Sequence, residues 1–76
     1  MNSVKIDARR LLCPMPVIRV QDKVLELSPG CRVEAVCTDP GALNDIPAWA
    51  RLNGHRILET RTEDDEYIIV LEVGDS

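Results

Sequence analysis

Residues 4–27 read VKIDARRLLCPMPVIRVQDKVLEL, and two hydrophobic periods meet within this stretch. Apolar and polar side chains alternate from Val4 to Ala8, which is the pattern of a half-buried strand. From Pro14 to Leu27 the apolar side chains recur at steps of three and four, as on one face of a helix. The expected face is made of Val17, Val20, Val24 and Leu27, widened by Ile18 and Leu25. The stretch therefore predicts a strand that runs through a short loop into an amphipathic helix.

The rest of the chain predicts three more strands and a second helix. The expected bounds are a strand over residues 32–37, a helix over 45–54, and strands over 55–62 and 66–73. Asp45 is the expected cap of the second helix, with Pro47 tolerated in its first turn. This helix should bury Ile46, Trp49, Ala50 and Leu52. The acidic residues 63–65 are few enough to form a hairpin turn between the last two strands.

The order strand–helix–strand–helix–strand–strand predicts an α/β fold for residues 1–76 as a single domain. A crossover between parallel strands is nearly always right-handed, so both helices should pack on the same face of the sheet. The result is a two-layer sandwich with a four-stranded mixed sheet. Parity along the strands places Tyr67, Ile69, Leu71 and Val73 under the helices. The solvent side should carry Lys5, Asp7, Arg32, Glu34, Glu66 and Glu72.

Size and charge narrow the possible functions. A chain of 76 residues buries only about 60% of the surface of its unfolded form, so any chemistry should lie near the surface. A formal charge of −4 argues against direct binding of nucleic acid, which requires a basic surface. No apolar run approaches membrane length, and the charged first ten residues do not resemble a signal peptide. We therefore expect a monomeric cytoplasmic protein with no nucleic-acid or membrane partner.

Cys13 is the candidate catalytic residue, because it lies where the first strand meets the first helix. If Cys13 is the N-cap, Pro14 and Pro16 occupy the first and third helical positions, where a missing N–H breaks no hydrogen bond within the helix. A thiolate there can accept a hydrogen bond from the N–H of Met15 or Val17, and the helix dipole favours the ionised form. The sequence thus predicts a thiol with a pKa below the free value of about 8.5.

Two arginines precede this cysteine. Arg9 and Arg10 could add positive potential around the thiolate, although salt screens exposed charges. A purely structural interpretation is equally open at this point, because free cysteines are among the most buried residue types and Cys13 could simply cap the helix.

The remaining polar candidates have simpler interpretations. Asp39 and Asp45 fit turn and cap residues, and the alternative is a role in positioning partners near Cys13. Cys37 fits a buried core position by its parity, and the alternative is a resolving thiol that forms a disulfide with Cys13. Three cysteines are too few for a secreted disulfide framework, and they and the lone histidine lack the spacing of zinc ligands. We expect no metal site.

The chain resembles the TusA/SirA-like family of small bacterial sulfur-carrier proteins. The matching segments occur in order along nearly the whole chain: Asp7-Ala8-Arg9, Leu12-Cys13-Pro14-Met15-Pro16, Asp39-Pro40, Asp45-Ile46-Pro47-Ala48-Trp49 and Gly54-His55. The resemblance implies the same two-layer sandwich. It also implies that Cys13 accepts sulfane sulfur as a covalent persulfide and passes it on, with no metal or organic cofactor.

The resemblance further implies the kinds of partner. Donors in the family are cysteine desulfurases or rhodaneses, and acceptors are proteins of sulfur relays that serve tRNA thiolation, molybdenum-cofactor biosynthesis or sulfur oxidation. Such a carrier is a sulfurtransferase component that needs both donor and acceptor proteins. Arg10 stands where the family pattern usually has glycine, and Met15 replaces an acidic residue of one branch.

Two other functions remain open from the sequence. One is thiol–disulfide exchange that uses Cys13 and Cys37, and the other is a regulatory adaptor that uses the same surface only for binding. Replacing Cys37 separates a persulfide carrier from a disulfide exchanger, because only the exchanger needs it. Replacing Cys13 tests the adaptor, which should keep its function.

Overall fold

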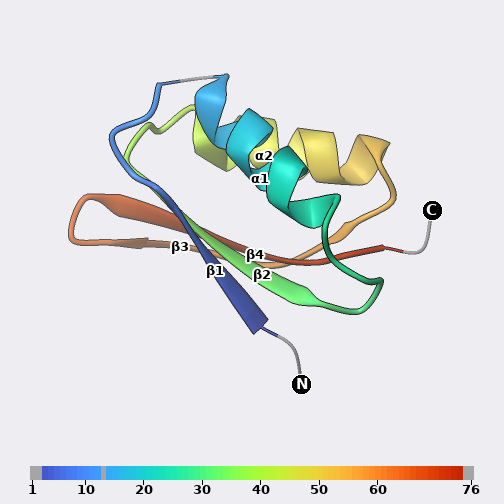
Figure 1. The fold of residues 1–76 in the computed structure, drawn as a ribbon. Helices are drawn as coiled ribbons and strands as arrows, with labels where there is room; N and C mark the ends of the chain where they lie inside the picture. The colour runs from blue at the N-terminus through green and yellow to red at the C-terminus, as the bar shows by residue number, and fades with distance from the viewer. Residues whose placement is uncertain (1–2, 13, 75–76) are drawn as a thin grey trace.

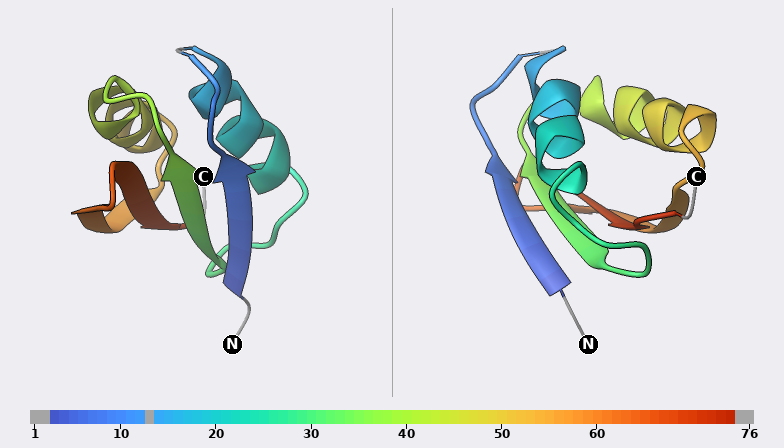
Figure 2. Two further views of the ribbon diagram at one scale, coloured as in Figure 1. Left: turned by 90° about the vertical axis from the view of Figure 1, so that its left-hand side faces the viewer. Right: turned by 45° about the vertical axis from the view of Figure 1, so that its right-hand side comes forward.

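The structure is a computed structural model that describes residues 3–12 and 14–74. The described residues form β1 (Ser3–Ala8), α1 (Met15–Val24), β2 (Arg32–Cys37), α2 (Ala42–Leu52), β3 (Arg56–Glu63) and β4 (Glu66–Glu72). Figure 1 shows α1 and α2 lying over one face of the sheet, and both views of Figure 2 keep them on that face. The predicted α/β sandwich, with its element order and its single helical layer, is confirmed.

The four strands form one mixed sheet in the order β1-β2-β4-β3. β1 pairs with β2 in parallel, and β4 pairs antiparallel with both β2 and β3. In the parallel pair, Ala8 lies beside Cys37, so β1 and β2 end at the same edge of the sheet. The loops that lead into α1 and α2 therefore leave the sheet side by side. This edge carries the candidate site.

The core lies between the sheet and the helices. Each helix buries residues four apart, namely Pro16, Val20 and Val24 on α1 and Ala42, Ile46 and Ala50 on α2. This spacing places three side chains on one helical face toward the sheet. The strands contribute alternate residues, among them Ile6, Ala8, Val33, Ala35, Cys37, Ile69, Leu71 and Val73. The period-two pattern of the sequence therefore identified the inner face of the sheet correctly.

The end of α1 and the bounds of α2 depart from the expectation. Helix α1 ends at Val24 rather than Leu27, because the N–H groups of Glu26 and Leu27 donate to carbonyls only three residues back. Leu25 is consequently 77% exposed. Helix α2 begins at Ala42 rather than after Asp45. Leu52 in its last turn is 86% exposed, so the expected burial of Leu52 is wrong.

The open face of the sheet carries charged residues, as the sequence predicts, but it also has an apolar centre. Val36, Ile68 and Val70 are buried there in a cluster of their own, separate from the main core. Charged side chains lie on the same face, and Lys5 on β1 forms an ion pair with Glu34 on β2. The hairpin between β3 and β4 turns at Asp64 and Asp65, both with positive φ, as a two-residue turn of the right twist requires.

Candidate functional site

The candidate site is the pair of loops that leave the sheet beside each other. One loop covers residues 9–12 and leads toward Cys13, and the other covers residues 38–41 and leads into α2. The backbone N–H of Arg10 donates a hydrogen bond of 2.8 Å to the hydroxyl oxygen Oγ1 of Thr38, which joins the two loops. Cys13 itself lies outside the described residues, so its role stays a prediction. Its neighbours Leu12 and Pro14 are both exposed.

Arg10 adopts a backbone conformation that glycine takes more easily than arginine. Its φ is 66°, in the left-handed region. An L-residue there costs roughly 1–2 kcal/mol, whereas glycine adopts this conformation freely. A neutral hydrogen bond contributes about 1 kcal/mol net, so the bond to Thr38 is of the right size to offset much of that cost. The loop thus keeps a glycine-like turn although it has no glycine.

Arg9 directs its guanidinium group to carboxylates. Its Nε lies 2.9 Å from Oδ1 of Asp7, and its Nη1 lies 3.3 Å from Oε2 of Glu66 on β4. The hydrogen bonds from Arg9 lower the pKa of the Asp7 carboxyl to about 2. The hydrogen bond to Asp7 and then that to Glu66 raise the pKa of Arg9. The positive charge of Arg9 is therefore balanced by two carboxylates beside the loop.

The start of α1 is shifted by one residue from the expectation. Pro14 occupies the N-cap position, so Met15 and Pro16 are the first two helical residues, and the predicted N-cap position of Cys13 is wrong. The N–H of Met15 donates to the carbonyl of Leu12 at 2.9 Å, so it is not free to bind a thiolate. A proline at the second position still breaks no hydrogen bond, because the first N–H groups of a helix have no partner within it.

Side chains at this helix start divide between core and solvent. Pro16 is buried against the sheet. Leu12, Met15 and Ile18 are 76%, 45% and 40% exposed. Three large apolar side chains therefore lie in water on either side of position 13, where a partner protein could cover them.

Asp39 and Asp45 differ in what they do at the start of α2. The Asp39 carboxylate accepts a hydrogen bond from the N–H of Gly41 at 3.1 Å, and its carbonyl accepts one from Ala42 at 3.0 Å. This is the turn role predicted for Asp39. Asp45 lies exposed in the first turn of the helix, where its negative charge interacts favourably with the helix dipole. The N-cap is Gly41. The predicted cap role of Asp45 is therefore wrong.

Two of the three thiols belong to the core. Cys37 has no exposed surface and Cys31 is 5% exposed. Burial, with a smaller contribution from the charge of Asp39, raises the pKa of Cys37 to about 11. A thiol that holds its proton this strongly is a poor nucleophile and a poor leaving group near neutral pH.

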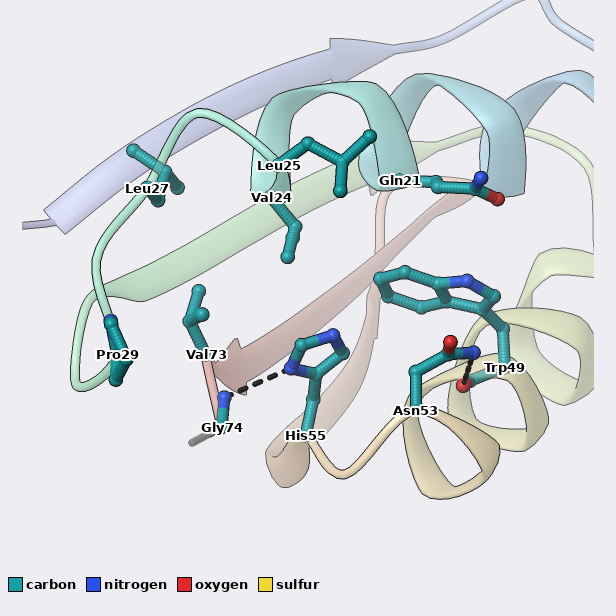
Figure 3. A pocket seen from close by; sticks show the side chains of 10 residues that line it. All are labelled: Gln21, Val24, Leu25, Leu27, Pro29, Trp49, Asn53, His55, Val73 and Gly74. Carbon is teal, nitrogen blue, oxygen red and sulfur yellow. Dashed lines mark hydrogen bonds between the residues drawn. The ribbon is translucent and has the colours of Figure 1, made fainter. Parts of the chain in front are cut away.

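The opposite end of the molecule has a groove of about 440 Å³. It lies between the carboxyl ends of the two helices and the end of β4, as Figure 3 shows. The N–H of Gly74 donates to Nδ1 of His55 at 2.9 Å, and the His55 ring lies 5.0 Å from that of Trp49. Sequence reasoning found Gly54-His55 as a motif but gave it no role. The structure shows that His55 fastens the end of β4 to the start of β3.

Within the described residues, no group of three or more His, Cys, Asp or Glu side chains is placed to hold a metal ion. In the same part of the chain, neither helix has the length and apolar character needed to cross a membrane.

Comparison with known proteins gives a consistent result. The family model described as Sulfurtransferase TusA matches residues 4–73. The "Putative sulfur carrier protein YrkI" of Bacillus subtilis (strain 168) is 44% identical over 66 residues, which are 86% of this chain and 88% of that protein. The sulfur carrier protein TusA of Pseudomonas aeruginosa (strain LESB58) is 36% identical over 63 residues, 83% of this chain and 80% of that one.

The fold comparison agrees. A crystal structure of a SirA-like protein from Desulfitobacterium hafniense matches with a TM-score of 0.84, covering 95% of this chain and 99% of that one at 24% identity. That likeness concerns the fold. Because the family model matches nearly all of the sequence, this chain belongs to the TusA family of sulfurtransferases.

Proposed function

We propose that this protein is a sulfur carrier that holds sulfane sulfur as a persulfide on Cys13. The observation that carries the proposal is the distribution of the thiols. Cys31 and Cys37 are buried in the core, and Cys13 follows the loop at the carboxyl end of β1, between two exposed residues. Family membership supports the same assignment, because the relatives are named as sulfur carriers.

The proposed reaction is two successive thiol exchanges. The Cys13 thiolate attacks the outer sulfur of a persulfide on the donor, the donor's S–S bond breaks, and the donor thiolate leaves with the electron pair. The product is Cys13–S–SH, which keeps the donor persulfide's proton. An acceptor thiolate then attacks the outer sulfur, and the Cys13 thiolate leaves. No net oxidation occurs, so the chemistry requires no metal or organic cofactor.

Partner proteins take the place of a substrate pocket in this proposal. The donor is a cysteine desulfurase or a rhodanese, and the acceptor is a further protein of a sulfur relay. Exposed Leu12, Met15 and Ile18 supply an apolar surface that either partner can cover. Turnover therefore needs donor and acceptor together, in a reducing compartment such as the cytoplasm that keeps the thiols free.

Thiol–disulfide exchange between Cys13 and Cys37 is the less favoured function. Cys37 is fully buried and its pKa is raised to about 11, so the thiolate that would resolve a disulfide is scarce at neutral pH. A persulfide carrier needs no second thiol.

Intact-mass spectrometry tests the proposal directly. The reduced protein is incubated with a cysteine desulfurase plus cysteine and, separately, with a rhodanese plus thiosulfate. We expect the gain of one sulfur atom that a reductant removes, in the wild type and in Cys37→Ala, and no gain in Cys13→Ser. Loading that survives in Cys13→Ser would contradict the proposal. A loss of two hydrogens that requires both Cys13 and Cys37 would establish the disulfide function instead.

A further inference from the structure

Thr38 holds a position that the proposed chemistry does not explain. The parallel pairing of β1 with β2 ends at Ala8 and Cys37, so Arg10 and Thr38 follow on neighbouring loops. They are 28 residues apart in sequence, and the N–H of Arg10 meets Oγ1 of Thr38 at 2.8 Å. This is a tertiary hydrogen bond to a residue whose φ of 66° is costly for arginine.

Thr38 lies between two residues that are held in place. Cys37 before it is the last residue of β2 and has no exposed surface. Asp39 after it is held in a turn by the N–H groups of Gly41 and Ala42. Arg10 itself has a left-handed φ of 66°, and the Thr38 hydroxyl accepts its N–H, so this hydrogen bond stabilises a loop conformation that is otherwise costly for arginine.

The residues between Arg10 and position 13 are also held in place. After Arg10, Leu11 packs against the core and the carbonyl of Leu12 accepts the N–H of Met15. Arg10 before position 13 and Met15 after it are thus both held by hydrogen bonds. We infer that Thr38 is a positioning residue for Cys13, acting through Arg10. This inference rests on the proposed function of Cys13.

The test compares Thr38→Val, which keeps the branched shape but removes the acceptor, with Thr38→Ser, which keeps the hydroxyl. The first measurement is the rate of sulfur loading from a cysteine desulfurase with cysteine. We expect Thr38→Val to load about fivefold more slowly, the weight of one neutral hydrogen bond. Thr38→Ser should load at the wild-type rate. Equal rates in wild type and Thr38→Val, or equal losses in both variants, would overturn the inference.

A second measurement does not depend on sulfur transfer. Iodoacetamide alkylation of Cys13 is followed by intact mass across a range of pH. At neutral pH, we expect the alkylation rate of Thr38→Val to differ from that of the wild type by at least twofold, in either direction. The alkylation rate of Thr38→Ser should equal that of the wild type. A general loss of structure would instead expose Cys31 and Cys37, which would appear as a second and third alkylation. Absence of sulfur loading in wild type would overturn the proposed function alone, and an unchanged alkylation profile in Thr38→Val would overturn the inference.

Discussion

The two ends of this molecule are built in different ways. At the carboxyl ends of β1 and β2, the loops are exposed and carry a non-glycine residue with positive φ, and the N–H of Arg10 donates to the hydroxyl of Thr38. At the other end, the start of β3 and the end of β4 interlock. His55 accepts the N–H of Gly74, and Gly74 lies directly against the backbone of Gly54. The first end is thus exposed and held by polar contacts, whereas the second is closely packed.

We expect the loop end to determine reactivity and the far end to determine the stability of the fold. In the proposed function, the persulfide has to reach into two different partners, which requires an exposed end with side chains such as Leu12 in water. The opposite end can then carry the packing that fixes the fold. Changes at the far end should therefore alter the free energy of unfolding, and changes at the loop end should alter sulfur transfer more than stability.

The largest expected effect comes from Gly74→Ala. A Cβ atom at position 74 would overlap the carbonyl oxygen of Gly54, and both groups are backbone atoms that cannot move aside independently. We expect the free energy of unfolding to fall by roughly 3 kcal/mol or more, measured by urea denaturation. The matched control is Gly30→Ala, because Gly30 has a φ of +92° but no atom within 4 Å of the added carbon. The control should lose only about 1–2 kcal/mol.

Equal losses in these two variants would contradict the close packing at the far end. Sulfur loading is also measured on the folded fraction of Gly74→Ala. That rate should match the wild type, because the change is remote from the loop of residues 9–12.

A smaller effect concerns Cys37, which lies at the loop edge of the sheet but belongs to the core. Its pKa is raised from 9.0 to about 11 in the folded state, so the folded protein keeps the thiol proton that the unfolded chain releases. The resulting stability is fully present below pH 9 and is lost as pH rises to about 11. The loss amounts to roughly 2–3 kcal/mol.

Urea denaturation between pH 8 and pH 11 measures this effect. The free energy of unfolding should decline more steeply with pH in the wild type than in Cys37→Ala, which has no thiol to titrate. Parallel curves would mean that Cys37 ionises as readily in the folded protein as in the unfolded one. Cys37 would then belong to the reactive end rather than to the core.

The smallest expected effect is at Arg10. Arg10→Gly removes the cost of a left-handed arginine, but it also adds entropy to the unfolded chain, so a net gain of about 0.5 kcal/mol is expected. Arg19→Gly, at an exposed position inside α1, should instead lose about 1 kcal/mol. Equilibrium unfolding in urea compares the two. Loss of stability in Arg10→Gly equal to that in Arg19→Gly would mean that the loop conformation carries no strain.

Much of the fold could be predicted because it depends on local periods. Alternation defined β2 at Arg32–Cys37, and the inward residues of β4 are those that parity selects. Helix ends were less predictable, since they depend on which groups find partners. Asp45 looks like a cap before Pro47, but Asp39 and Gly41 begin the helix three residues earlier than expected. Leu25 and Leu52 continue the apolar pattern beyond the buried faces.

The candidate site divides in the same way. Residue type and short spacing are enough to find the family motif, the strand–helix junction at Cys13 and the inward parity of Cys37. Several contacts, by contrast, are seen only in the folded chain. The Thr38 hydroxyl accepts the N–H of Arg10, and the ring of His55 accepts the N–H of Gly74. Arg9 forms ion pairs with Asp7 and Glu66. These contacts join residues of different segments or fix one of several possible side-chain directions. No local period encodes them, because they exist only once the strands are paired and the loops are brought together.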